Sequence, residues 1–310
     1  MVASNQTMVT EFILQSFTEN PQLQAFLFIL LLLLFVMALV GNVLIIAAIH
    51  VSTGLHLPMY FFLANLAILD IICTSSVLPK VLQNLIAVKK TISYGGCINQ
   101  MFFLSWSLSS ELVLFTAMAY DRYIAICQPL HYSKMMSKTV CVVLAAFVWS
   151  IGWLNSATLT GLVLRLSFCG PNFIPHFFCE MPPILLLSCT PTYWIDIVTI
   201  MADMFVAGLN FFLTMVSYSF VIASIMKIRT REGKKRAFST CSSHLTVVTL
   251  YYSTVLYTYI RQVLGTSGSL DKLVSLLYTV LTPTLNPLIY TLRNKDVKVA
   301  LKKLFPFPPP

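Results

Sequence analysis

The sequence contains seven apolar stretches of about 20 residues or more, and this feature constrains the fold most strongly. A helix rises about 1.5 Å per residue, so each stretch can cross the roughly 30 Å hydrocarbon core of a bilayer. Only 10% of the residues are charged, too few to cover a surface exposed to water. The stretches are residues 25–49, 58–79, 98–124, 139–162, 195–226, 237–260 and 270–292.

We therefore predict an all-α membrane protein, a seven-transmembrane helix bundle over residues 25–292. Residues 1–24 are expected to form an extracellular tail, and residues 293–310 a cytoplasmic tail. In the cytoplasmic tail, Val297, Leu301 and Leu304 alternate with lysines, which predicts a short amphipathic helix on the membrane surface. A frayed basic tail is the alternative.

The distribution of lysine and arginine predicts the orientation, because basic loops stay in the cytoplasm. With the N-terminus outside, 14 of the 20 basic residues are cytoplasmic, and residues 1–24 contain none. The cytoplasmic set is Arg122, Lys134, Lys138, Lys227, Arg229, Arg231, Lys234, Lys235, Arg236, Arg293, Lys295, Lys298, Lys302 and Lys303. Asn5 begins an N-glycosylation sequon in the same outer tail, which agrees with this orientation.

The net charge of +9 does not indicate a nucleic-acid partner, because these basic residues border the membrane. We find no nucleophile elbow, phosphate loop or metal-ligand triad in a plausible context, so we expect the chain not to be an enzyme. A transporter or channel is the main alternative from another class. The odd number of spans and the absence of an internal repeat disfavour it.

Four cysteines lie at or beyond the outer ends of the spans, where disulfides form: Cys97, Cys169, Cys179 and Cys189. Their spacing leaves three pairings open. His176, Cys179 and Glu180 could instead bind a metal such as copper, but Cys179 is more useful in a disulfide. We therefore expect no metal site there.

Several motifs occur in the expected spans and order. They are Gly41-Asn42, residues 55–63 (LHLPMYFFL), residues 118–132 (MAYDRYIAICQPLHY), Ser217-Tyr218, residues 236–245 (RAFSTCSSHL) and residues 283–290 (PTLNPLIY). Together they resemble the signature of odorant receptors, a branch of the rhodopsin-like G-protein-coupled receptors. The resemblance extends over nearly the whole chain.

The resemblance implies a receptor for small volatile molecules that activates a stimulatory, olfactory-type heterotrimeric G protein and raises cyclic AMP. It also implies Cys97–Cys179 and Cys169–Cys189 disulfides, an arrestin as a further partner, and the plasma membrane of sensory cilia as the location. A rhodopsin-like receptor for another small lipid-like or metabolite ligand is the alternative function. Membrane lipid is the remaining expected partner.

The expected switch lies at the cytoplasmic ends of the spans. Asp121 can hold Arg122 at rest, beside Tyr123, and a released Arg122 could reach an inserted helix of the G protein. Tyr218 and Tyr290 resemble tyrosines that stabilise the open cytoplasmic cavity of active receptors. Asn286-Pro287 is expected to act as a hinge, because proline leaves a carbonyl that an asparagine or a water can satisfy.

Two acids, Asp70 and Glu111, are expected near the middle of neighbouring spans. Such carboxylates either share a proton or hold a cation, with Asn42 and Asn286 as further ligands. Oxygen donors suit sodium, the one cofactor that we consider. The sequence does not choose between the two interpretations.

The expected ligand site begins with an apolar face that carries two hydroxyl groups on the third span: Leu104, Ser105, Leu108, Ser109 and Leu112. By resemblance, other spans add Ala202, Val206, Tyr252, Val255, Leu256, Tyr259, Tyr278 and Thr279. Leu104 stands where amine receptors carry an aspartate, and we expect no other acid nearby. The sequence therefore predicts a small, mainly apolar ligand without a cationic amine, and broad tuning.

Overall fold

The computed structural model describes residues 9–169, 172–264, 269–293 and 295–304. Within these ranges, the side chains of residues 236, 240, 259–264, 269, 291–293, 295 and 304 are not described. Asn5 and the Tyr259 side chain, both named above, therefore lie outside the described part of the chain.

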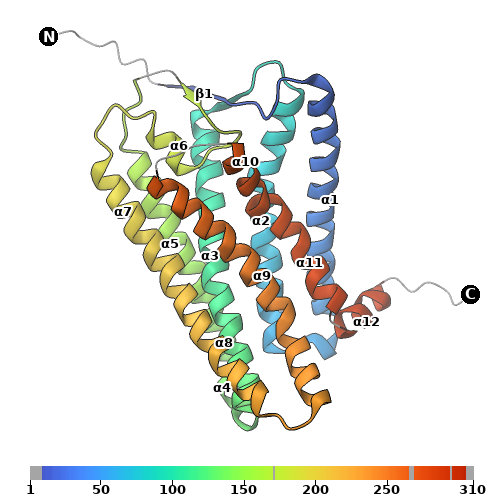
Figure 1. Cartoon of the computed structure of the whole chain (residues 1–310). Helices are drawn as coiled ribbons and strands as arrows, with labels where there is room; N and C mark the ends of the chain where they lie inside the picture. The colour runs from blue at the N-terminus through green and yellow to red at the C-terminus, as the bar shows by residue number, and fades with distance from the viewer. Residues whose placement is uncertain (1–8, 170–171, 265–268, 294, 305–310) are drawn as a thin grey trace, which may run out of the picture.

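Seven long helical segments form a bundle, which confirms the predicted fold (Figure 1). Six segments of the described chain are long and apolar enough to cross a membrane. The remaining one, α9, begins with a basic turn. The segments are α1 (Pro21–Val51), α2 (Pro58–Ile86), α3 (Tyr94–Cys127), α5 (Lys138–Val163), α7 (Tyr193–Asp203) continuing into α8 (Leu209–Lys227), α9 (Arg231–Leu264), and α10 (Ser269–Leu276) continuing into α11 (Thr282–Arg293).

Helix α3 is the centre of the bundle. It packs against α2, α5, α8 and α9, and most of its residues are buried. Helix α1 lies at the edge, against α2 and α11 (Figure 1). Large apolar side chains such as Phe26, Leu33 and Phe147 are exposed on the outer helices. A bilayer would cover these faces, because hydrocarbon is as apolar as the side chains themselves.

Local sequence explains where the helices begin. Asn20 accepts hydrogen bonds from the backbone N–H groups of Gln22 (2.9 Å) and Leu23 (3.4 Å), and Pro21 occupies the first turn of α1. Ser93 accepts from the N–H of Gly96 at 3.1 Å at the start of α3. These caps satisfy backbone donors that have no partner within the helix.

Two helices contain one π-helical turn each. Residues Met204–Gly208 connect α7 to α8, and residues Leu277–Leu281 connect α10 to α11. A π-turn inserts an extra residue, so the side chains beyond it face in a new direction. Both turns lie on segments that border the cavity described below.

A three-stranded sheet covers one end of the bundle, which we call the sheet end. Strand β1 (Glu11–Leu14) lies between β2 (Thr91–Ser93), to which it is antiparallel, and β3 (Phe173–Ile174), to which it is parallel. Phe12 and Leu14 point inward and are buried. The sequence analysis did not predict this sheet, since it treated residues 1–24 as a tail.

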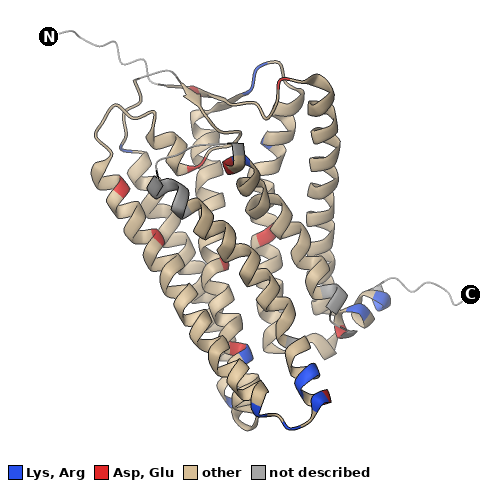
Figure 2. Ribbon diagram, in the orientation of Figure 1, with Lys and Arg blue, Asp and Glu red and all other residues tan. Residues whose placement is uncertain are grey.

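The opposite end carries short elements and basic residues, and we call it the basic end. Here η1 (Thr53–Leu55), η2 (Pro129–His131) and α4 (Tyr132–Met135) form turns, whereas α6 (Met181–Leu185) lies at the sheet end. Figure 2 shows blue lysine and arginine segments gathered around the start of α9 and on α12 (Lys295–Leu304). Helix α12 buries Val297 and Ala300 and exposes Lys298 and Lys302, so it is amphipathic as predicted.

Candidate functional site

A cavity of about 200 Å³ lies among α3, α5, α7, α9 and the π-turn of the seventh segment. Its walls are mostly apolar and carry several hydroxyl groups. The lining residues are Ser105, Leu108, Ser109, Leu112, Asn155, Leu159, Asp203, Val206, Ala207, Tyr251, Val255, Thr258 and Tyr278. This composition suits a small, mainly apolar ligand with few polar contacts.

The structure places many of the predicted ligand residues in this cavity. They are Ser105, Leu108, Ser109, Leu112, Val206, Val255 and Tyr278. The helical spacing of the α3 residues therefore found one complete wall. Tyr278 is anchored, because its hydroxyl donates to Glu180 at 2.9 Å and to Ser275 at 3.2 Å.

Other predicted ligand residues do not line the cavity. Leu104 packs with Phe177 and Phe178 of the segment between α5 and α6, and Leu256 is 61% exposed. Thr279 is buried and donates to the Ser275 carbonyl at 2.6 Å. The remaining two are Ala202, which packs beside the cluster that includes Met181, and Tyr252, whose ring lies 5.0 Å from that of Phe211.

Sequence reasoning missed the cavity residues Asn155, Leu159, Asp203, Ala207, Tyr251 and Thr258. Asn155 donates to the Ser109 hydroxyl at 2.9 Å, which fixes one polar wall. The expectation that no acid lies near the ligand site is wrong, because Asp203 lines it. A charged residue within an apolar span was the available signal.

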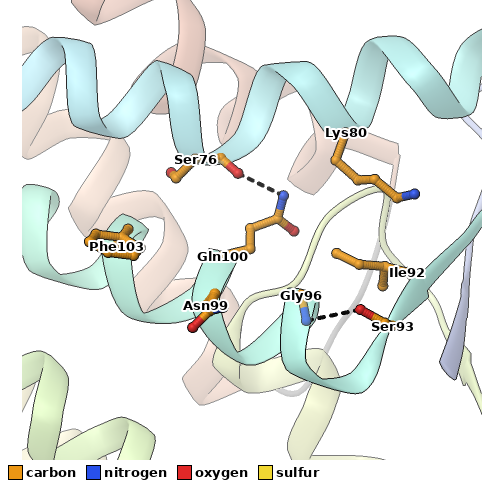
Figure 3. A pocket seen from close by; sticks show the side chains of 8 residues that line it. All are labelled: Ser76, Lys80, Ile92, Ser93, Gly96, Asn99, Gln100 and Phe103. Carbon is orange, nitrogen blue, oxygen red and sulfur yellow. Dashed lines mark hydrogen bonds between the residues drawn. The ribbon is translucent and has the colours of Figure 1, made fainter. Parts of the chain in front are cut away.

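A second cavity, of about 360 Å³, lies at the sheet end between α2, β2 and the start of α3 (Figure 3). The main polar side chains that line this cavity already form hydrogen bonds with other groups of the protein. Gln100 donates to the Ser76 carbonyl at 3.0 Å and accepts from the N–H of Cys179 at 2.8 Å. Lys80 donates to Gln83 at 2.9 Å. Through these two contacts, Gln100 of α3 connects the segment that contains Cys179 to α2.

The structure contains disulfides between Cys97 and Cys179 and between Cys169 and Cys189, the pairs that the resemblance implied. Their Cα atoms are 5.4 and 5.8 Å apart. The first bond attaches the segment between α5 and α6 to α3 and uses the Cys179 thiol that a metal site would need. His176 lies 3.5 Å from Glu180, and we find no group of metal-ligating side chains within the described residues.

At the basic end, Asp121 and Arg122 form a buried ion pair. The Arg122 Nε donates to the Asp121 carboxylate at 3.0 Å, and a second guanidinium nitrogen contacts the same oxygen. The Tyr132 hydroxyl donates to the other Asp121 oxygen at 2.8 Å. Burial, together with the Asp121 charge, raises the pKa of Tyr132, so its hydroxyl remains a donor. Arg122 is therefore held by its neighbour.

Tyr218 and Tyr290 are both buried near this ion pair, but only Tyr218 has a partner there. Its hydroxyl shares a hydrogen bond of 2.5 Å with Nδ1 of His244. The Tyr290 hydroxyl has no hydrogen-bond partner among the described atoms. His244 belongs to a motif that the sequence analysis quoted, although no role was assigned to it there. Tyr123 packs its ring on that of Phe220, 5.8 Å away.

The four residues considered for a cation meet only in part. Asn286 donates its amide to both Asp70 oxygens at 3.0 Å. The carbonyl oxygen of Asn286 and both Glu111 oxygens are buried without a described hydrogen-bond partner. Asn42 instead donates to the carbonyls of Ala38 (2.9 Å) and Pro283 (3.1 Å).

Pro287 explains the role of Asn42. A proline has no N–H, so the carbonyl four residues earlier, that of Pro283, loses its helical donor. The Asn42 amide replaces this donor. A Cβ atom at Gly41 would lie 3.0 Å from the Pro287 Cβ, so glycine permits α1 to approach the kink. Gly41 and Asn42 thus allow α1 to pack against α11 at the point where Pro287 interrupts the helical hydrogen bonds.

This chain is similar to known proteins over most of its length. A family model described as "Olfactory receptor" matches residues 31–306. Human olfactory receptor 13A1 is 60% identical over 304 residues, covering 98% of this chain and 93% of the relative. Human olfactory receptor 13G1 is 51% identical, covering 98% and 99%, and mouse olfactory receptor 5AR1 is 44% identical, covering 98% of each chain.

Proposed function

The chain belongs to the olfactory receptor family, and from this premise we propose that it binds small volatile molecules in the cavity beside α3. It is a multi-pass membrane receptor and not an enzyme. The observation that carries the ligand proposal is the cavity itself: it is small, mostly apolar, and lined by residues from several helices.

We propose that the sheet end faces outward and the basic end faces the cytoplasm. Disulfides form in oxidising compartments, and both lie at the sheet end. Basic residues near the other end favour the anionic inner leaflet (Figure 2). Helix α12 would rest on that leaflet through Val297. From the family resemblance, we also propose that the receptor lies in the plasma membrane of sensory cilia and that Asn5 is glycosylated.

The coupling partner that we propose is a stimulatory, olfactory-type G protein, with arrestin as a second partner. In the resting arrangement, Asp121 neutralises and holds Arg122, and the Tyr132 hydroxyl donates to the other Asp121 oxygen. An active arrangement would release the guanidinium to a helix of the G protein and let Tyr218 and Tyr290 line the opened end. The ligand must bind this arrangement more tightly than the resting one to shift the population.

A packed row of side chains connects the cavity to this switch. Tyr251 lines the cavity, donates to the Leu108 carbonyl at 3.0 Å, and meets the Phe115 ring at 5.2 Å. The Phe115 ring lies 5.9 Å from the ring of His244, which bonds to Tyr218. We propose that ligand contact with Tyr251 shifts α9 through this row, because buried aromatic rings have few alternative packings.

Filling the cavity tests the ligand site. We expect Val255→Phe to raise the half-maximal concentration of activating volatiles by about tenfold or more, because its ring occupies ligand space. The measurement is cyclic AMP in cells that express the receptor, during a screen of volatiles. Val143→Phe is the matched control, since Val143 is 61% exposed on the outer face of α5. Equal potency for both variants would place the ligand elsewhere.

We further propose that sodium binds between Asp70 and Glu111 in the resting arrangement. Three buried oxygen atoms without partners, two from Glu111 and one from Asn286, lie with the Asp70 carboxylate in this region. Hard cations prefer such oxygen ligands. Two acids that share a proton remain the competing interpretation.

Replacing potassium by sodium at constant ionic strength should raise the half-maximal ligand concentration by about fivefold, since sodium would favour the resting state. Asp70→Asn and Glu111→Gln should abolish this shift, whereas Glu19→Gln, at an exposed site, should preserve it. Cyclic AMP dose-response curves in permeabilised membranes provide the measurement. If sodium has no effect on the unmodified receptor, the acids share a proton instead.

A further inference from the structure

Asp203 is the acidic member of the cavity wall. It is the last residue of α7, directly before the π-turn Met204–Gly208. The turn also supplies Val206 and Ala207 to the wall, so the carboxylate lies next to apolar side chains. Every other lining residue within the described chain is apolar or neutral.

The Asp203 carboxylate has no partner of its own. We find no hydrogen bond or ion pair from it to any described residue. The neighbouring acid on the same helix, Asp196, differs, because it accepts from the Thr192 hydroxyl at 2.9 Å. Asp203 is half-buried, and a carboxylate that is partly removed from water without a partner is costly, so a ligand that supplies one gains binding energy.

No described lysine or arginine lines the cavity that contains Asp203, and two of those near the sheet end have other partners. Lys272 donates to the Ser16 carbonyl at 3.2 Å, and Lys80 donates to Gln83. Neither lines the cavity that contains Asp203. The missing partner of the carboxylate is therefore best supplied by the ligand.

The other walls define the rest of the ligand. Leu108, Leu112 and Val255 offer an apolar surface, and the Ser105 hydroxyl has no described hydrogen-bond partner. A volume of about 200 Å³ admits only a short chain or a single ring. The ligand thus needs a small apolar body and one cationic or strongly donating head.

We propose that Asp203 is the counter-ion for a small lipophilic amine, which makes amines a preferred ligand class of this receptor. This inference rests on the proposed function, since it assigns a ligand to the same cavity. The ammonium head would donate to the Asp203 carboxylate and to Ser105, while the hydrocarbon body packs on α3 and α9. It reverses the expectation, drawn from Leu104, that amines are disfavoured.

Matched probes test the inference: n-alkyl amines, alcohols and methyl ketones of five to seven carbons, with cyclic AMP as the readout. On the unmodified receptor, we expect amines to be about tenfold more potent than alcohols of equal length. Asp203→Asn should raise the half-maximal concentration of amines by about tenfold or more and that of alcohols by less than about threefold. Asp196→Asn is the matched control and should change neither.

The outcomes separate the two proposals. If alcohols or ketones activate the receptor but amines are no more potent, or if Asp203→Asn leaves amine potency unchanged, the amine inference is overturned and the cavity stands. If Val255→Phe leaves every response unchanged, the cavity proposal fails, and the amine inference with it. Surface staining of each variant distinguishes a change in expression from a change in ligand potency.

Discussion

Gly152→Val is expected to remove most of the receptor from the cell surface. A Cβ atom at Gly152 would overlap the Ser110 hydroxyl oxygen and would lie 2.9 Å from the Ser110 backbone nitrogen. Helix α5 therefore touches the backbone of α3, the central helix, and no side-chain rotation can relieve the second contact. Overpacking of this kind costs about 1–3 kcal/mol or more, and the helices would have to separate.

Surface immunostaining and the melting temperature in detergent measure this effect. Gly161→Val on the same helix is the matched control, because no atom lies within 4 Å of a Cβ at Gly161. Gly152→Ala should act in the same direction but less strongly. Normal surface levels and melting temperature for Gly152→Val would mean that α3 and α5 are not in this close contact.

Arg122→Ala is expected to abolish ligand-evoked cyclic AMP without loss of surface expression, because we propose that the guanidinium contacts the G protein. Asp121→Asn should have the opposite sign. It removes the charge that holds Arg122 and should raise the cyclic AMP level without ligand by about threefold or more, since a shift of 1.4 kcal/mol changes a population tenfold.

Two further variants sharpen this test. Tyr132→Phe removes one hydrogen bond to Asp121 and should raise the basal signal by less than Asp121→Asn does. Lys134→Ala, at an exposed basic position of the same end, is the control for general charge loss. A basal signal that falls in Asp121→Asn would show that the ion pair supports the active state instead.

The helices could be predicted from sequence because each one contains an apolar run that is recognisable without knowledge of its neighbours. A long apolar run specifies a membrane helix whatever its neighbours are, since the backbone must satisfy its own hydrogen bonds in lipid. The second helix starts at Pro58, as expected, whereas the first and third start at Pro21 and Tyr94, about four residues before the expected ends. Polar end residues extend a helix beyond the apolar run that reveals it.

The ligand site could be predicted only in part, because its walls depend on how helices face one another. The α3 wall followed from simple helical spacing. On α7, the expected residue was Ala202 and the observed one is its neighbour Asp203, directly before a π-turn. On α9, Tyr251 lines the cavity rather than Tyr252. A rotation of one position along a helix has no local signature in sequence.

The three-stranded sheet could not be predicted, because no local sequence pattern marks its strands. Strand β3 has only two residues, and β1 has four in a segment that also reads as a polar tail. Its pairing joins Phe12 to Ile92 and Leu14 to Ile174, contacts that local propensity does not encode. Only the three-dimensional arrangement shows that β1 is the middle strand.

The central place of β1 determines the order in which this protein can mature. β1 is translated before both of its pairing partners, β2 and β3, which belong to later loops. Until Ile174 has been translated, β1 has unpaired backbone groups and the apolar side chains of Phe12 and Leu14 lack their packing partners, so the strand is prone to non-native association. Completion of the three-stranded sheet is thus a late step in the folding of this protein.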